Sequence, residues 1–324
     1  MTIDVIPNGS SARVRIMKNR AWADIAAGGI VLAGSWALLA RGVPFMRTWF
    51  YVFAWWSLVL VLDAANVLRT GISPLSSEAP GFAWTALVSI PVWLVFEAFN
   101  ARLRNWSYHE MPSSLAVRWL GYAVAFATVI PALKELAALV RSFMKGEPSR
   151  VGEAGAARFR TPRALLDASA GAGVLALALA LAAPRLFFPL VWLGFIFLIE
   201  PLNYRRGRPS LLRDLEEGRC APVLAWMAAG MAAGVIWEGL NWFAGSHWEY
   251  HIPYLNFGRI FQMPVFGFGG FIVFALEVFA LDSFLRGVYL RLKSRPALRF
   301  AFWAVLAAFS LAVFALIDRF SVVF

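Results

Sequence analysis

Apolar residues form nine long stretches along the 324-residue chain, separated by short polar segments. A helix that crosses a bilayer needs about 20 mostly apolar residues. The predicted spans are 21–40, 49–68, 82–101, 115–139, 164–183, 186–203, 221–243, 265–285 and 299–318. A tight turn at Pro184-Arg185 separates the fifth span from the sixth. The pattern therefore predicts an all-α, polytopic membrane helix bundle.

Composition supports this fold class and removes several others. The chain is 60% hydrophobic and 15% charged, whereas soluble domains carry about 25% charged residues. The spans therefore leave no room for a sizeable soluble domain. A single cysteine, Cys220, excludes an internal disulfide and a cysteine-based metal cluster. No motif identifies a cofactor, so the cofactor is unknown at this stage.

The basic residues predict an orientation. A net charge of +11 would suggest nucleic acid as a partner of a soluble protein. In a polytopic protein the positive-inside rule explains it better, and no nucleic acid is expected. With the N-terminus in the cytoplasm, 21 of the 30 Lys and Arg residues lie on the cytoplasmic side and 8 on the other. We therefore expect a multi-pass inner-membrane protein with a periplasmic or extracellular C-terminus.

Two segments share an ordered pattern of acidic, amide and aromatic residues. Residues 96–109 read FEAFNARLRNWSYH, and residues 237–251 read WEGLNWFAGSHWEYH. The preceding spans contain Asp63 with Asn66 and Glu200 with Asn203, and the following spans contain Glu135 and Glu277. The three offsets are 137, 141 and 142 residues. This regularity predicts a tandem duplication of a four-helix unit, with both copies in the same orientation around a pseudo-two-fold axis along the membrane normal.

The duplication divides the chain into five predicted regions. They are a cytoplasmic basic N-terminus (1–20), a first four-helix repeat (21–140), a cytoplasmic linker (141–163), a second four-helix repeat (164–285), and a basic loop with a ninth helix (286–324). We interpret the N-terminal apolar stretch as a retained helix, because it is long and lacks a clear small-residue cleavage site.

Acidic side chains inside hydrocarbon are costly and mark functional or helix-packing positions. Glu97 and Glu238 lie near the predicted outer ends of their spans, and a Trp-x-Tyr-His motif follows each after a short spacer. Histidine and tyrosine next to a carboxyl suit general acid–base chemistry. The candidate catalytic residues are Glu97, Tyr108, His109, Glu238, Tyr250 and His251. Alternatively, the aromatic residues form an interfacial belt and the acids only hold helices together.

A second set is predicted to contact a substrate. Asn100 and Asn241 follow the glutamates at i+3, on the same helical face. The substrate-binding candidates are Asn100, Trp106, Glu135, Asn241, Trp248, Arg259 and Glu277. Arg259 lies in an irregular loop, 253–270, which is predicted either to form a re-entrant lip over a lipid site or to be an ordinary external loop.

Two further ligand types are a metal ion and a phosphate. Glu97, His109, Glu238 and His251 supply donors adequate for zinc or iron, but they lack metal-ligand spacing, so no metal site is predicted. Arg205, Arg206 and Arg208 lie in a polar loop that is expected to contact phospholipid headgroups, or alternatively to hold a phosphate.

Residues 197–218 and 234–271 resemble an uncharacterised family of bacterial polytopic membrane proteins, a likeness that implies no particular activity. The chain is also faintly similar to lycopene-cyclase-type membrane domains, which are small repeated helix bundles with a W-x-[YF] turn, a following proline and paired acids. Trp248-Glu249-Tyr250 and Pro264 match that pattern. Val265 and Phe266 stand where the resemblance implies the paired, catalytic acids.

Three functions fit these patterns. The first is a membrane-embedded enzyme or binding protein for a lipid or isoprenoid, with a site near the outer face. The second is a transporter or flippase that uses intramembrane carboxylates, although the predicted spans show no conspicuous break. The third is a structural or assembly subunit. Membrane lipids are the expected partners, and a homo-oligomer or a membrane-complex partner is also compatible with the sequence.

Overall fold

The computed structural model describes residues 11–77, 79–144 and 159–323. Residues 1–10 of the predicted N-terminal region and 145–158 of the predicted linker lie outside this part. Within the described residues, nine helices are long and apolar enough to cross a membrane. The chain is therefore a multi-pass, all-α membrane helix bundle, as its apolar pattern predicted.

The described residues of the first half form five helices and one strand. They are α1 (Ser11–Ala40), α2 (Pro44–Thr70), α3 (Ala79–Leu103), β1 (Trp106–His109), α4 (Leu115–Phe126) and α5 (Val129–Arg141). Helix α1 begins at Ser11, so part of the predicted N-terminal tail is helical.

The second half contains the remaining elements. They are α6 (Arg163–Ala182), α7 (Pro184–Phe187), η1 (Phe188–Leu190), α8 (Val191–Arg205), α9 (Leu211–Glu216), α10 (Cys220–Phe243), β2 (His247–Tyr250), β3 (Arg259–Ile260), β4 (Met263–Pro264), η2 (Val265–Gly267), α11 (Phe268–Arg291) and α12 (Pro296–Phe320). The chain turns at Ala183 between α6 and α7, next to the predicted Pro184-Arg185 turn.

The predicted fourth span is not one continuous helix. It breaks at Ala127 and Thr128, between α4 and α5. Pro131 follows the break and has no backbone N–H to donate to the carbonyl of Ala127, so one helical hydrogen bond is missing there. Both residues keep right-handed helical backbone angles, and Leu115–Arg141 still counts as one of the nine membrane-capable helices.

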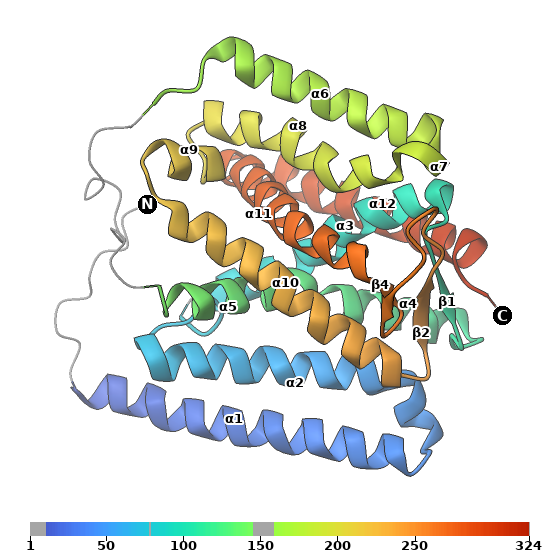
Figure 1. Ribbon diagram of the computed structural model, residues 1–324. Helices are drawn as coiled ribbons and strands as arrows, with labels where there is room; N and C mark the ends of the chain where they lie inside the picture. The colour runs from blue at the N-terminus through green and yellow to red at the C-terminus, as the bar shows by residue number, and fades with distance from the viewer. Residues whose placement is uncertain (1–10, 78, 145–158, 324) are drawn as a thin grey trace.

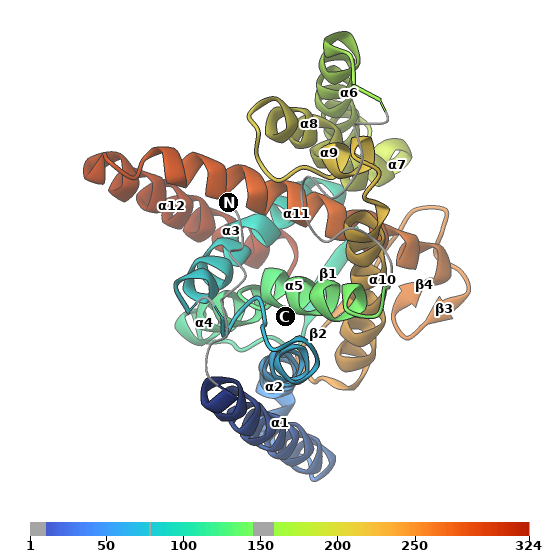
Figure 2. The same ribbon diagram turned by 90° about the vertical axis from the view of Figure 1, so that its left-hand side faces the viewer.

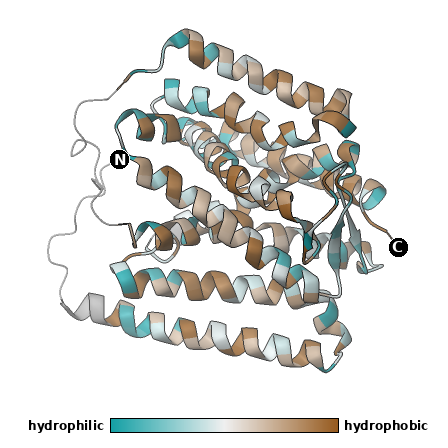
Figure 3. Ribbon diagram, viewed as in Figure 1, coloured by the Kyte–Doolittle hydropathy of each residue, from teal (hydrophilic) through white to brown (hydrophobic). Residues whose placement is uncertain are grey.

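The long helices run side by side, with β1 and β2 at one end of the bundle (Figure 1). We call this end the strand side and the other end the opposite side. Viewed along the bundle, α1 and α6 lie at opposite edges, whereas α3, α5, α10 and α11 lie near the middle (Figure 2). Helix α5 packs on α10, and α11 packs on α3, so each half contacts the other. Apolar residues dominate the long helices, as Figure 3 shows.

An ion pair joins the halves within the bundle. Lys134 Nζ of α5 lies 2.7 Å from Asp282 Oδ2 of α11. The indole N–H of Trp84 on α3 donates to the other oxygen of Asp282 over 3.1 Å. Asp282 and Trp84 are buried and Lys134 is half-buried, so the pair satisfies two charges that would otherwise be costly in this environment.

Helix α12 is fastened to the first half by backbone bonds. It packs on α3, and the chain after it runs beside β1. The Tyr108 N–H donates to the Ser321 carbonyl over 2.7 Å, and the Val323 N–H donates to the Tyr108 carbonyl over 2.9 Å. The C-terminal segment thereby covers one edge of β1.

Candidate functional site

The two Trp-x-Tyr motifs meet as antiparallel strands. In the register of β1 and β2, Trp106 lies opposite Tyr250, and Tyr108 lies opposite Trp248. The pairing is symmetric about Ser107 and Glu249. A two-fold relation between the halves would produce this register, although the duplication itself stays a sequence-based prediction. Sequence alone could not show that the motifs lie together.

Strand periodicity sorts the motif residues onto two faces, because successive side chains of a strand point to opposite sides. Trp106, Tyr108, Trp248 and Tyr250 line a cavity within the bundle. Their neighbours Ser107 and His109 on β1 contact His251 and Glu249 on the other face of the strands. The predicted catalytic tyrosines and histidines are therefore separated by the two strands.

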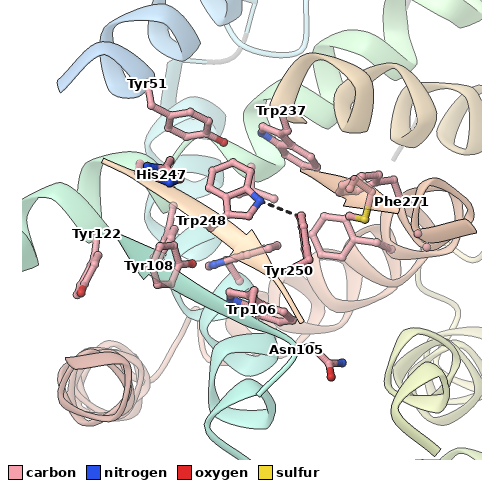
Figure 4. Close-up of a pocket in the computed structure, with 18 of the residues that line it drawn as sticks. Tyr51, Asn105, Trp106, Tyr108, Tyr122, Trp237, His247, Trp248, Tyr250 and Phe271 are labelled. Carbon is pink, nitrogen blue, oxygen red and sulfur yellow. Dashed lines mark hydrogen bonds between the residues drawn. The ribbon is translucent and has the colours of Figure 1, made fainter. Parts of the chain in front are cut away.

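The cavity has a volume of about 360 Å³ and is lined by both halves of the chain. Aromatic side chains gather around it, including Tyr51, Trp106, Trp237, Trp248 and Phe271 (Figure 4). Residues from α2, α3 and α4 form one part of the wall, and residues from α8, α10 and α11 form another. The two motifs therefore contribute to one site and not to two separate pockets.

Glu97 is fully buried behind β1 and accepts bonds from three side chains. The Tyr108 hydroxyl donates to Oε1 of Glu97. Trp93 and Trp106 donate their indole N–H groups to the same oxygen over 2.9 and 3.1 Å. Trp93, Trp106 and Tyr108 line the cavity while Glu97 does not, so the carboxyl reaches the cavity only through these side chains.

Glu238 holds the corresponding position in the second half and is also fully buried. The Tyr250 hydroxyl donates to Oε1 of Glu238 over 2.8 Å, and the Trp248 indole N–H donates to the Tyr250 oxygen over 2.9 Å. The second carboxyl oxygen, Oε2, has no hydrogen-bond partner among the described residues. The second half thus forms a Trp248–Tyr250–Glu238 chain that starts at the cavity wall.

Burial keeps both tyrosines protonated. Desolvation raises the pKa of Tyr108 well above its usual value, and the neighbouring Glu97 carboxyl raises it further. The pKa of Tyr250 is raised in the same way, by burial first and by Glu238 second. Each hydroxyl is therefore a neutral donor to its glutamate near pH 7.

The two asparagines hold the strands and do not line the cavity. Asn100 donates from Nδ2 to the Trp106 carbonyl over 2.8 Å and accepts the Trp106 N–H over 3.2 Å. Asn241 makes the same pair of bonds with the Trp248 backbone, at 2.8 and 2.9 Å. Each amide thus uses both its donor and its acceptor to hold the backbone of a strand tryptophan.

The three histidines of the sequence lie on the strands or immediately after them. Ser107 Oγ lies 2.9 Å from His109 Nε2 and 2.8 Å from His251 Nε2. The His109 and His247 rings stack with centroids 5.6 Å apart. His109 and His251 are not part of the cavity wall, whereas His247 is. The four-donor set of Glu97, His109, Glu238 and His251 is likewise divided between the two faces.

Three other predicted substrate contacts lie away from the cavity wall. Arg259 is exposed and donates to the Tyr250 carbonyl over 3.2 Å, which holds the loop to β2. Glu135 accepts a bond from Asn66 Nδ2 over 2.6 Å. Glu277 accepts the Phe195 N–H over 3.0 Å. Each of these two carboxyl groups thus joins two helices. Such contacts are the ones expected if the acids only hold helices together.

The acids of the two inner motifs hold loops on the opposite side. Asp63 accepts the Ser76 N–H over 3.0 Å, and Glu200 accepts the Leu212 N–H over 2.9 Å. Ser210, the N-cap of α9, also donates to Glu200. These contacts fit the structural interpretation of the inner motifs.

Sequence reasoning missed an ion pair at the cavity wall. Arg118 of α4 lines the cavity, and its Nε lies 2.7 Å from Asp318 Oδ1 of α12. Tyr122 and Trp119 also donate to Asp318, over 3.0 and 2.8 Å. The sequence feature that could have revealed this pair is the presence of two opposite charges, Arg118 and Asp318, near the ends of separate apolar spans. Tyr51 and the tryptophans of α3, α8 and α10 were missed because single aromatic residues abound in every span.

The irregular loop 253–270 forms part of the cavity wall. Strands β3 and β4 pair antiparallel within it, with Ile260 opposite Met263. Leu255, Met263 and Phe266 line the cavity. The loop therefore lies against the cavity, and its re-entrant character stays a prediction.

Comparison of the chain with protein-family models, curated proteins and solved structures finds no match. The site is thus interpreted from its own geometry.

Proposed function

We propose that this protein binds an uncharged lipid or isoprenoid in the aromatic cavity on the strand side, as a membrane-embedded enzyme or binding protein. The observation that carries the proposal is the single cavity into which both Trp-x-Tyr motifs project. Small-molecule sites are concave and mostly apolar, with a few polar groups that fix orientation. The wall of this cavity has that character.

The charges around the cavity favour an uncharged ligand. Arg118 is the sole Lys, Arg, Asp or Glu among the described residues that line it, and Asp318 neutralises it. Glu97 and Glu238 lie behind tyrosines and tryptophans. A phosphate or carboxylate in this cavity would lose its hydration without gaining an unpaired cation, which is costly.

The tyrosine–glutamate pairs supply acid–base capacity. Glu238 exchanges a proton through the Tyr250 hydroxyl, which lines the cavity, and Glu97 does so through Tyr108. A positioned acid or base of this kind typically contributes about 10² to 10⁴ in rate. The enzyme form of the proposal assigns proton transfer to these pairs and binding to the aromatic wall.

Two glycine substitutions test the binding step. Gly270 lines the cavity, and a Cβ added there would meet no atom within 4 Å. The leucine side chain of Gly270→Leu should therefore occupy part of the cavity, and its Cβ atom would not clash with neighbouring atoms. Gly171 on the peripheral helix α6 is the matched control, because an added Cβ there also meets nothing within 4 Å.

The purified proteins are labelled with a photoactivatable isoprenoid alcohol, and the labelled peptides are identified by mass spectrometry. We expect labelling of cavity residues in the wild type and in Gly171→Leu, and its loss in Gly270→Leu. Equal labelling of all three proteins would refute binding in the cavity. The acid–base step is then tested with Glu238→Gln, which should retain labelling but fail to restore the cellular lipid profile of a deletion strain.

One observation favours transport as a second candidate. The break between α4 and α5 lies beside the cavity, because Ala125, Phe126 and Val129 line it. Broken helices often form the substrate sites of transporters. In vesicles, a transporter would move the same isoprenoid probe between leaflets, whereas an enzyme or binding protein would retain it on one side.

A further inference from the structure

The opposite side of the bundle carries a buried arginine that pairs with no acidic residue in the described part of the chain. Arg208 lies in the loop between α8 and α9 and is 8% exposed. Its guanidinium donates from Nη1 to the Phe284 carbonyl over 3.2 Å and lies over the Phe284 ring. No carboxylate contacts it among the described residues, and its Nε has no hydrogen-bond partner there.

Two other arginines of this region, unlike Arg208, form ion pairs with acidic side chains. Arg205 pairs with Asp167 at 2.6 Å, and Arg219 pairs with both Asp214 and Glu217. These pairs neutralise two of the five arginines in the segment 204–220. Arg205 is therefore already paired with a carboxylate.

The loop is built to hold Arg208 in place. Asn203 donates to the Ala280 carbonyl of α11 over 2.8 Å, and Ser283 donates to the Pro209 carbonyl over 2.7 Å. Gly207 adopts a φ of +63°, a left-handed conformation that glycine adopts easily. Gly287 allows the close approach, because a Cβ there would lie 2.3 Å from Arg208 Nε.

Two further cations lie near this guanidinium. Burial lowers the pKa of Arg208, and the charges of Arg291 and Arg206 lower it further. Arg291 follows Gly287 by one helical turn on α11, and Arg206 precedes the Gly207 turn. Both are exposed. Arg206 and Arg291 are therefore close enough to act electrostatically on a buried charge that no anion among the described residues contacts.

We propose that Arg206, Arg208 and Arg291 form a binding site for one phosphate group. Planar guanidinium groups bind phosphate oxygens through paired, charge-assisted bonds. The phosphate belongs either to an anionic phospholipid headgroup, since the loop lies at the end of two spans, or to a soluble phosphate compound. The site is separate from the aromatic cavity and does not depend on the function proposed for that cavity.

The test uses the full-length protein in two arms. Phosphatidylcholine nanodiscs with rising phosphatidylglycerol content measure headgroup binding, and delipidated protein in detergent titrated with inorganic phosphate measures soluble phosphate. Thermal unfolding midpoints are recorded for the wild type, Arg208→Gln, Arg291→Gln and Lys18→Gln. Lys18 is the matched control, because it is exposed on α1 and its replacement removes the same charge from the same side of the bundle.

We expect the wild type and Lys18→Gln to be stabilised by one of the two anions. The apparent affinity should fall about tenfold or more in Arg291→Gln and Arg208→Gln. Stabilisation in the first arm identifies a headgroup, and stabilisation in the second identifies a soluble phosphate. Arg291 is exposed, so its variant remains informative if Arg208→Gln does not fold. The proposal fails if neither anion stabilises the wild type, or if all three variants respond as the wild type does.

Discussion

The Tyr250 hydroxyl donates to Glu238 Oε1 across 2.8 Å, and this bond links the cavity wall to a carboxyl whose second oxygen has no hydrogen-bond partner among the described residues. Tyr108 and Glu97 are joined in the same way. Because each tyrosine is on a strand and each glutamate is on a helix, these bonds also fix the strands to the bundle. The same contacts therefore serve stability and the proposed chemistry.

Replacing Tyr250 with phenylalanine should destabilise the fold. The change removes the donor to Glu238 and the acceptor of the Trp248 N–H. Leaving buried polar groups unpaired costs about 1–3 kcal/mol of unfolding free energy. Denaturant titration in detergent micelles measures this loss.

The matched control is Tyr254→Phe, since Tyr254 is 71% exposed. Its effect should stay within about 0.5 kcal/mol, as for most surface changes. Equal losses in the two variants would show that the hydroxyl of Tyr250 has no special role.

Because Tyr108 is buried, the free energy of unfolding should fall with rising pH in the alkaline range. Burial raises the pKa of Tyr108 in the folded protein above its usual value near 10. Above about pH 10 the unfolded chain therefore releases this proton first, and stability falls by up to about 1.4 kcal/mol per pH unit. Below pH 10 the contribution is constant.

Unfolding free energies of the wild type and Tyr108→Phe, measured from pH 8 to 11, provide the test. The variant should show a shallower decline above pH 10. Parallel profiles across the whole range would contradict a buried, neutral Tyr108.

The effects on stability of replacing Arg118 and of replacing Asp318 should be strongly coupled. Arg118 is 6% exposed, and removing one partner of a buried pair costs about 3–5 kcal/mol. We expect Arg118→Met and Asp318→Asn each to lower stability, and the double variant to lose clearly less than the sum. A double-mutant cycle of unfolding free energies measures this coupling.

The exposed pair of Arg47 and Glu110, at 2.8 Å, provides a comparison. Its side chains are 55% and 56% exposed, so its coupling should be about 0–1 kcal/mol. Additive losses at Arg118 and Asp318 would mean that α12 is not fastened to the cavity wall by this contact.

The sequence by itself determined the membrane class and the positions of most spans. Lengths of about 20 apolar residues leave few alternatives in a bilayer, because every backbone polar group must be satisfied within a helix. The sequence also singled out Glu97, Glu238, Tyr108, Tyr250, Trp106 and Trp248 through their spacing. It could not predict the break before Val129, because a proline inside an apolar run is compatible with a continuous, kinked span.

Only the tertiary structure decided which of these side chains share a site. Pairing of β1 with β2 joins segments about 140 residues apart, and such long-range register is not encoded in local periodicity. The pairing directs the tyrosines into the cavity and leaves His109 and His251 on the other face, although each of these histidines directly follows one of the tyrosines in the sequence. Packing of α12 then supplies Asp318 to Arg118 from a helix outside the predicted repeat. Local sequence thus fixed which groups are buried in the membrane, and the contacts between distant segments fixed what those groups face.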